Sequence, residues 1–332
     1  MYGSQRHLKK TNSKRKNKLL YSLLLGSVKI LISVGLLIWL FSTDIAFLET
    51  LSRLKGIHIG MLLLAGLPIA ISYPLISWRW QYILNALGYD IGFREAISIS
   101  WIGSFFNHTL PTNMAGELVR VWAIYRRESS LEGAISSVIL DRIIALLALS
   151  AFIIVTLPLT HSIMGYDLAW TALAISSVII LMLIAGLLVS DVLVGVFRNY
   201  IYSKIMHMID ALSRDMRKVL VKSSVVLLFF SVVSFIAQAF SFWALALGLG
   251  VSINLADAII LIPPIFLITT LPISFAGWGL RELAVVTALS FINVPEEQSI
   301  VISLSYGFLT LAMAVPGGFI WLLNKNSRQN HS

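Results

Sequence analysis

The sequence predicts an all-α polytopic membrane protein with about six full transmembrane helices and two re-entrant hairpins in an inverted-topology repeat. Three observations predict this class. The chain of 332 residues is 58% hydrophobic and only 12% charged, and its mean hydropathy is +0.86. Apolar runs of about 20 residues, the length that crosses the hydrocarbon core, follow one another with short connections. One motif also occurs twice in altered form.

The N-terminal part predicts the first helix and the orientation of the chain. A basic tail over residues 1–18 precedes an apolar run from Leu19 to Phe41. This run is too long for the core of a signal peptide and lacks a clear small-residue cleavage site, so we interpret it as a transmembrane helix. Positively charged flanks stay cytoplasmic, which places the N-terminus inside. Because the net charge of +9 lies mainly in the tail and loops, it is a topology signal, and we expect no nucleic-acid partner.

The next elements predict a hairpin that does not cross the membrane. A second helix over about 60–78 returns to the inside, where Arg79 and Arg94 lie. Residues 96–125 are followed by Arg126 and Arg127, so this segment starts and ends on the same side. We therefore expect a re-entrant hairpin with residues 111–116 near its tip.

Two further helices, over about 131–158 and 168–190, are joined by a loop without Lys or Arg and complete this part of the chain. They lead to the most basic connection in the sequence. Its basic residues are Arg198, Lys204, Arg214, Arg217, Lys218 and Lys222. This connection is expected to be cytoplasmic.

The second half predicts the same order with opposite orientation. A helix over about 221–248 leads outward, and the flanks of segment 257–291 lack Lys and Arg, so this second hairpin enters and leaves from outside. A last helix over about 298–323 places the tail 324–332 in the cytoplasm. Residues 19–323 therefore form one domain with repeats over about 19–158 and 168–323, in the cell (plasma or inner) membrane. The alternative is that Pro111 and Pro272 merely kink two spanning helices.

The register of the two halves supports a repeat independently of charge. The motif LPTNMAGELVR begins at Leu110, and LPISFAGWGLR begins 161 residues later at Leu271, with five identical positions. Upstream, Glu95 matches Asp257 at an offset of 162. A single one-residue gap therefore relates the halves.

The motifs also predict an anion site. Proline breaks a helix and glycine permits a sharp turn, while a reversal inside the membrane is tolerated only next to protein or a water-filled cavity. A helix N-terminus follows each motif and attracts anions, and Arg120 and Arg281 add positive charge. If the hairpins meet near the midplane, both arginines face one cavity. The candidate substrate-binding residues are Arg120, Arg281, Glu117, Glu282, Asp141, Arg142, Asn113, Gly116 and Gly277.

Structural roles compete with binding at these charges. Asp141 lies inside a helix and is expected to pair with Arg142 or Arg120, while Glu117 and Glu282 could each neutralise the neighbouring motif arginine. Arg79 is expected to extend to the membrane interface. The sequence contains no P-loop, no G-x-S-x-G, no H-E-x-x-H and no cysteine, and its histidines are scattered. We therefore expect no enzymatic activity, no cofactor and no metal site.

Four segments together resemble a known family. LPTNMAGELVRVWAIYRRE, AISSVILDRIIALLAL, LPISFAGWGLRELAVV and VPGG are similar to the lysylphosphatidylglycerol synthase transmembrane region family, also called flippase-like, over about residues 20–323. The resemblance implies movement of an aminoacylated lipid between leaflets and carries over Glu117, Arg120, Asp141, Arg142, Arg281 and Glu282. The soluble synthase domain of the best-understood relatives has no counterpart here, so lipid charging is not expected. Members usually carry Tyr-Arg in the last helix, where this chain has Tyr306-Gly307.

We therefore expect a protein that binds, and translocates, an anionic phospholipid or lipid-linked molecule at a midplane cavity. One alternative is a transporter of a small soluble anion, which needs a cavity closed to the bilayer, whereas a flippase needs a lateral opening. The other alternative is a non-transporting membrane partner of a separate synthase or glycosyltransferase. A homo-oligomer is compatible with each hypothesis.

Overall fold

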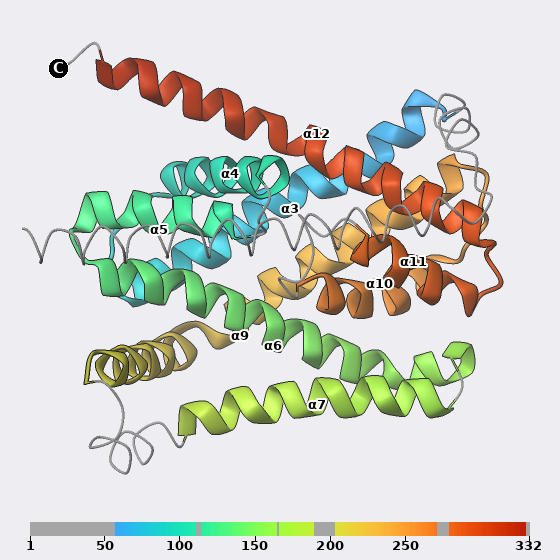
Figure 1. Cartoon of the computed structure of the whole chain (residues 1–332), viewed down its shortest axis with the longest axis horizontal. Coiled ribbons are helices and arrows are strands. Elements are labelled where there is room, and N and C mark those ends of the chain that lie inside the picture. The colour runs from blue at the N-terminus through green and yellow to red at the C-terminus, as the bar shows by residue number, and fades with distance from the viewer. Residues whose placement is uncertain (1–56, 111–113, 165, 189–202, 271–278, 330–332) are drawn as a thin grey trace, which may run out of the picture.

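The computed structural model describes residues 57–110, 114–164, 166–188, 203–270 and 279–329, and all regular structure in these ranges is helical (Figure 1). The predicted first helix, over 19–41, lies outside them. In chain order the helices are α3 (Ile59–Ala86), α4 (Phe93–Thr109), α5 (Ala115–Glu128), α6 (Leu131–Met164), α7 (Tyr166–Leu188), α9 (Ser203–Gly248), α10 (Leu255–Thr269), α11 (Leu280–Ser290) and α12 (Glu296–Gln329).

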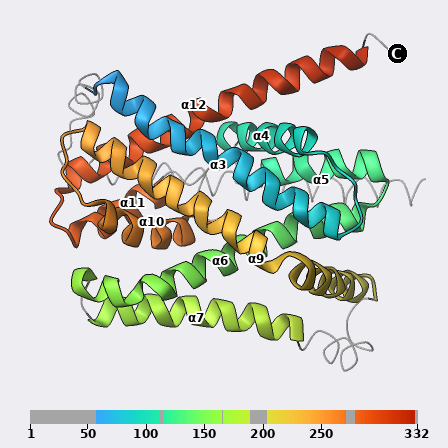
Figure 2. The same cartoon turned by 180° about the vertical axis from the view of Figure 1, so that it is seen from behind.

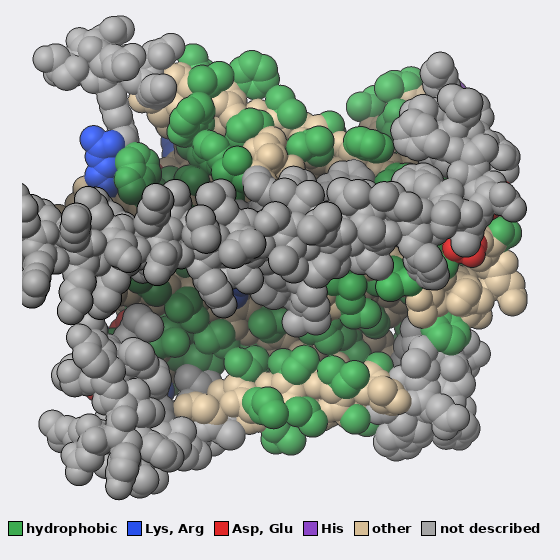
Figure 3. All heavy atoms as spheres, in the orientation of Figure 1, with side chains coloured by type: hydrophobic (Ala, Val, Ile, Leu, Met, Phe, Trp, Pro, Cys, Tyr) green, Lys and Arg blue, Asp and Glu red, His purple; other side chains and the backbone are tan. Residues whose placement is uncertain are grey.

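Four of these helices are long and apolar enough to cross a membrane. Their candidate spans are Ile59–Ala86, Leu131–Leu159, Asp210–Gly248 and Glu296–Asn324. Large apolar side chains face outward on these helices, for example Val155 (74% exposed) and Val225 (79% exposed). Much of the described surface in Figure 3 is accordingly hydrophobic. A helix with an apolar outer face needs lipid around it, so the all-α membrane class is confirmed.

Helix α9 is much longer than the sequence pattern indicates. The prediction began this helix at about residue 221, but α9 begins at Ser203 and runs for 46 residues. Charged pairs on successive turns, such as Arg214 with Asp210 and Lys218 with Asp215, stabilise the helix before its apolar part begins. The basic connection from residue 203 onward is therefore helical.

Two pairs of short helices occupy the predicted hairpin segments. Helices α4 and α5 have 17 and 14 residues, and α10 and α11 have 15 and 11 residues. At 1.5 Å per residue, none of them reaches the roughly 30 Å thickness of the hydrocarbon core. Helix α5 folds back along α4 (Figure 1), so these two helices are not one kinked span. Re-entry of the two pairs into the membrane stays a prediction.

Several contacts between helices recur in the two halves of the chain. Helix α3 lies along α9, its equivalent at the offset of about 161 (Figure 2). Helix α12 packs on α4 as α6 packs on α10, and α5 packs on α6 as α11 packs on α12. Each of these helices thus contacts the helix that its equivalent in the other half would predict, which supports an internal repeat. The inverted orientation of the halves stays a prediction.

Gly116 is required for the close approach of α4 and α5. A Cβ atom at Gly116 would lie 2.1 Å from the carbonyl oxygen of Gly103 in α4, and the amide of Gly116 donates to Asn107 Oδ1 at 2.7 Å. The backbone at Gly103 and the start of α5 therefore leave no room for a side chain. The close packing of α4 and α5 therefore explains why residue 116 is glycine. From the sequence, this glycine was expected to permit a sharp turn and to line the binding site.

We predict that Gly116→Ala separates α4 from α5 and lowers the free energy of unfolding by about 1–3 kcal/mol, as overpacking typically does. Gly186→Ala in α7 is the matched control, because a Cβ atom there has nothing within 4 Å. Unfolding of the purified protein in detergent, followed by circular dichroism, measures both. Equal stability of the two variants would contradict the close contact.

Candidate functional site

The first motif lines a cavity in the interior, which we call the central cavity. It has a volume of about 270 Å³ and lies among helices α3, α4, α5, α6, α9 and α10. Its charged lining residues are Arg79, Glu117, Arg120, Asp141 and Arg142. Apolar side chains, including Leu149, Phe235 and Phe266, line the remainder. Charges inside an apolar helical protein are costly unless they are paired, so their partners decide their roles.

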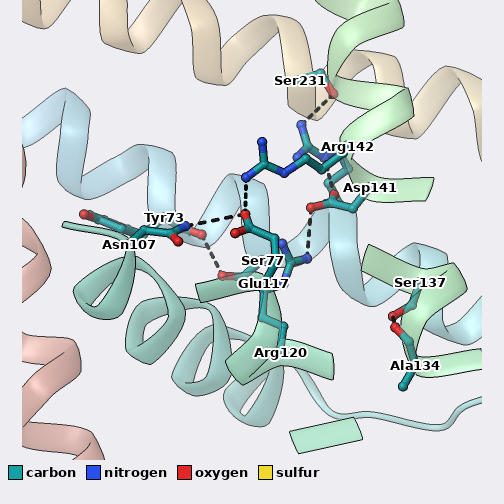
Figure 4. Close-up of polar contacts among 11 residues, drawn as sticks. Tyr73, Ser77, Asn107, Glu117, Arg120, Ala134, Ser137, Asp141, Arg142 and Ser231 are labelled. Atoms are coloured by element: carbon teal, nitrogen blue, oxygen red, sulfur yellow. Dashed lines mark hydrogen bonds and ion pairs between the residues drawn. The ribbon is translucent and has the colours of Figure 1, made fainter. Parts of the chain in front are cut away.

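The Asp141 carboxylate bridges two buried arginines (Figure 4). Arg79 Nε donates to Asp141 Oδ1 at 2.7 Å, and Arg120 Nη2 donates to Asp141 Oδ2 at 2.9 Å. Arg79 Nη1 also donates to Ser231 Oγ at 3.1 Å. The bridge joins α3, α5, α6 and α9 through charge-assisted hydrogen bonds. The predicted partners of Asp141 were Arg142 and Arg120. In the structure Asp141 pairs with Arg120 and also with Arg79, whereas Arg142 pairs with Glu117.

Arg79 does not extend to the membrane interface, so that expectation was wrong. The residue is only 5% exposed. Helix α3 continues to Ala86, about two turns beyond Arg79, so this arginine lies inside the helix bundle and not at a helix end. There the Asp141 carboxylate neutralises the guanidinium, which water would solvate at the interface.

Arg120 is held by its ring contact as well as by the bridge. Its guanidinium lies 4.1 Å from the centre of the Trp80 ring, a cation–π distance. Trp80 belongs to a buried cluster with Leu84 and Ile124, which fixes the ring. Arg120 Nε has no hydrogen-bond partner among the described residues. The first motif arginine therefore has a structural role in the bridge, and its buried Nε can still donate to a ligand or water.

Glu117 and Arg142 form a second, more accessible pair in the same cavity. Arg142 Nη2 donates to Glu117 Oε1, and Figure 4 shows this pair beside the Asp141 bridge. The side chain of Arg142 is 34% exposed and that of Glu117 is 14% exposed. Asn107 Nδ2 approaches the same Glu117 oxygen at 3.4 Å, while Glu117 Oε2 has no partner among the described residues. Arg142 is thus the most accessible of the paired arginines in this cavity.

The second motif arginine lines a neighbouring cavity, which we call the Arg281 cavity. Its volume is about 380 Å³. Arg281 Nη2 donates to Glu282 Oε1 at 2.8 Å, and Ser303 Oγ donates to the same oxygen at 3.0 Å. The other Glu282 oxygen accepts from the Gly279 amide at 2.6 Å, at the start of α11. Glu282 is fully buried. Through these contacts it neutralises Arg281 and caps the N-terminus of α11, which agrees with the structural role considered for it in the sequence analysis.

Gly307, which stands where members of the resembled family usually carry arginine, makes room for the Arg281 side chain. A Cβ atom at Gly307 would lie 2.2 Å from Arg281 Nη2. A side chain at this position in α12 would therefore displace the Arg281 guanidinium. The second residue of Tyr306-Gly307 accordingly determines where the charge of Arg281 lies in the cavity.

The two cavities share lining residues, and each contains one of the two motif arginines. Arg120 lines the central cavity, and Arg281 lines the other. Both cavities are lined by Asn107, Arg142, Phe266 and Thr270. Arg142 is therefore the charged residue common to both. Two further predicted site residues, Asn113 and Gly277, lie outside the described residues.

The charged groups of the two cavities leave a positive excess. The arginines are Arg79, Arg120, Arg142 and Arg281, and the carboxylates are Glu117, Asp141 and Glu282. Among the described residues, four arginines and three carboxylates sum to one positive charge, and Asp141 is shared between two of the arginines. In a poorly hydrated interior such an excess favours an anion.

Several polar residues of the site were not selected from the sequence as ligands. Tyr73 accepts from Ser104 Oγ at 3.1 Å and stacks on Trp101, and Tyr306 contacts Gln238 at 3.4 Å. Asn107 of α4 lies at both cavities, and its side chain accepts a hydrogen bond from the amide of Gly116 at the start of α5. Its position one turn before the first Pro-Gly motif was the signal that could have identified it.

The fold and the site define a helical membrane protein whose interior charges gather beside two pairs of short helices. The model of the family described as the lysylphosphatidylglycerol synthase TM region matches residues 26–318. The chain belongs to this family. It is also similar to a UPF0104 membrane protein of Methanocaldococcus jannaschii, with 25% identity over 275 residues that cover 75% of this chain and 80% of the relative.

We predict that Asp141→Asn destabilises the protein by about 3–5 kcal/mol, because two buried arginines lose their shared counter-charge. Glu95→Gln is the matched control: it removes the exposed partner of Arg127 and should cost less than about 1 kcal/mol. Unfolding in detergent, followed by circular dichroism, compares the two. An Asp141→Asn protein as stable as the parent would refute the bridging role.

Proposed function

We propose that this protein binds the headgroup of an anionic phospholipid in its interior and moves the lipid between leaflets, without catalysing a reaction. The observation that carries this proposal is the position of Arg142, whose side chain is 34% exposed and lies at both cavities among charges that sum to a positive value in the described residues. Its side chain ends in a guanidinium group. A phosphate can accept two parallel hydrogen bonds from such a group.

The cavity lining favours a lipid over a small soluble anion. Leu146, Leu149, Phe235 and Phe266 stand beside the charged groups of the central cavity. A headgroup next to acyl chains would match this combination, whereas a small hydrated anion gains little from apolar walls. The family description names lysylphosphatidylglycerol, a phospholipid whose headgroup contains a phosphate.

The repeated architecture supplies a route for movement. In our proposal the chain has six full spans and two re-entrant pairs, α4–α5 and α10–α11, which enter from opposite sides. Halves related in this way can exchange inward-open and outward-open states of similar energy. The matching helix contacts in the two halves support this scheme.

Cysteine accessibility tests the orientation, and the natural sequence contains no cysteine. We predict that Ser129→Cys and Lys218→Cys react with an impermeant maleimide only after the cells are permeabilised. Ser252→Cys and Glu297→Cys should react in intact cells. All four positions are exposed, so a lack of labelling reports the side of the membrane and not burial of the cysteine. Labelling of Ser129→Cys in intact cells would exclude a re-entrant α4–α5 pair.

Lipid exchange tests the function itself. We predict that the purified protein in liposomes accelerates leaflet exchange of a fluorescent phosphatidylglycerol without ATP. Arg142→Gln should slow the exchange about tenfold, because a charge-assisted hydrogen bond contributes about 1.5–3 kcal/mol. Arg142→Lys should retain part of the rate, since the charge remains but the planar fork is lost. Lys222→Gln, an equal loss of charge on the exposed part of α9, should leave the rate unchanged.

The outcomes separate the proposal from its rivals. Exchange at the rate of protein-free liposomes, with and without a proton gradient, would contradict translocation and favour a membrane partner of a separate synthase or glycosyltransferase. Efflux of a soluble organic anion without lipid exchange would favour the transporter of small anions. Equal rates for the parent protein and Arg142→Gln would remove the central cavity from the pathway.

A further inference from the structure

A third cavity lies on the side of α4 and α5 away from the central cavity, and we call it the basic groove. It has a volume of about 950 Å³ and is bordered by α4, α5 and α12. Arginines line one part of it and aromatic rings line the other. The residues that define it here are Arg94, Phe106, Trp122, Arg126, Arg127 and Trp321. None of them lines the central or the Arg281 cavity.

Two of the three arginines in the groove have no carboxylate partner among the described residues. Arg127 pairs with Glu95 and Glu128. Arg126 lies over the Trp122 ring at 5.4 Å from its centre and has no ion pair, and Arg94 likewise has none in the described ranges. Both are exposed. Figure 3 shows Lys and Arg side chains near this end of the molecule, where α5 ends in Figure 1.

The aromatic part of the groove is unusually accessible for such large rings. Trp122 is 53% exposed and Trp321 is 38% exposed. Phe106 meets Trp321 edge-to-face, with ring centres 5.5 Å apart, so α4 and α12 form one aromatic wall. Tryptophan beside arginine is the composition of a membrane interface, where the ring meets acyl chains and the cation meets phosphate.

The other half of the chain contains an equivalent groove without the charge. A cavity of about 340 Å³ is lined by Leu280, Leu283, Thr287 and Ala288 of α11, together with α6, α7 and α10. These positions correspond to Val119, Trp122, Arg126 and Arg127 at the offset of 161, and Arg94 corresponds to Ala256 at the offset of 162. The same helix packing therefore forms without arginines, so the arginines are not needed to join these helices. Their charge fits the cytoplasmic side that the sequence predicts, and on that side it can contact an anion.

We propose that the basic groove is a binding site for an anionic glycerophospholipid, whose phosphate contacts Arg94 and Arg126 and whose acyl chains lie along Trp122 and Trp321. This lipid comes from the leaflet next to the C-terminal end of α5, which the charge pattern predicts to be cytoplasmic. The site is separate from the central cavity, so it does not depend on transport. Its position beside α4 and α5 allows it to hold a lipid next to the helices that line the interior.

Photo-crosslinking tests this site directly. The full-length protein is reconstituted in phosphatidylcholine vesicles with a subsaturating amount of phosphatidylglycerol that carries a diazirine in one acyl chain. After irradiation, peptides that contain Trp122 or Trp321 should carry the label. Arg94→Gln and Arg126→Gln should each reduce the labelling about fivefold, which corresponds to about 1 kcal/mol per basic residue near a membrane surface. The double variant Lys218→Gln/Lys222→Gln removes from α9 as much charge as Arg94→Gln/Arg126→Gln removes from the groove, and it should label like the parent.

Three results would overturn the inference. Equal labelling of these peptides by a diazirine phosphatidylcholine would show no preference for an anionic lipid. Unchanged labelling after Arg94→Gln/Arg126→Gln would exclude the arginines. Absence of label from both peptides in the parent protein would show that another part of the chain covers the groove. Labelling that persists in an Arg142→Gln protein with slow lipid exchange would separate this site from the proposed transport function.

Discussion

The arrangement of this protein depends on one constraint: a charge inside an apolar helical bundle must have a partner. Asp141 is the partner of two arginines at once: its contact with Arg120 joins two consecutive helices, and its contact with Arg79 joins α6 to α3. A bundle in lipid gains little from apolar contact between helices, because the acyl chains are equally apolar. Polar bridges and close backbone contacts therefore determine which helices meet.

The same constraint separates structural charges from available ones. Arg79 and Arg120 are buried against one carboxylate, and Arg281 is neutralised by the fully buried Glu282. Arg142 is paired through Glu117, yet a third of its side chain is exposed and it lies at both interior cavities. In the proposed function the buried pairs hold the short helices in place, and Arg142 meets the headgroup.

Much of the architecture was predictable from sequence because membrane helices follow simple rules of length and charge. The Pro and Gly motifs identified the two breaks, and α4–α5 and α10–α11 occupy them. The start of α9 was not predictable from hydropathy, since its first turns are polar and are stabilised by pairs such as Arg214 with Asp210. Burial of Arg79 was missed because a sequence does not show that a helix continues past an arginine into a paired site. The Arg120–Asp141 contact was among the expected pairs, whereas the cavity that each motif arginine lines depends on tertiary packing.

The most direct test of the central claim is an experimental structure of the protein in nanodiscs that contain phosphatidylglycerol. We predict phosphate density within hydrogen-bond distance of the Arg142 guanidinium, at the junction of the central and Arg281 cavities, with acyl-chain density along Phe235 and Phe266. An interior that contains only water at Arg142, while the protein is fully folded and surrounded by anionic lipid, would contradict the account.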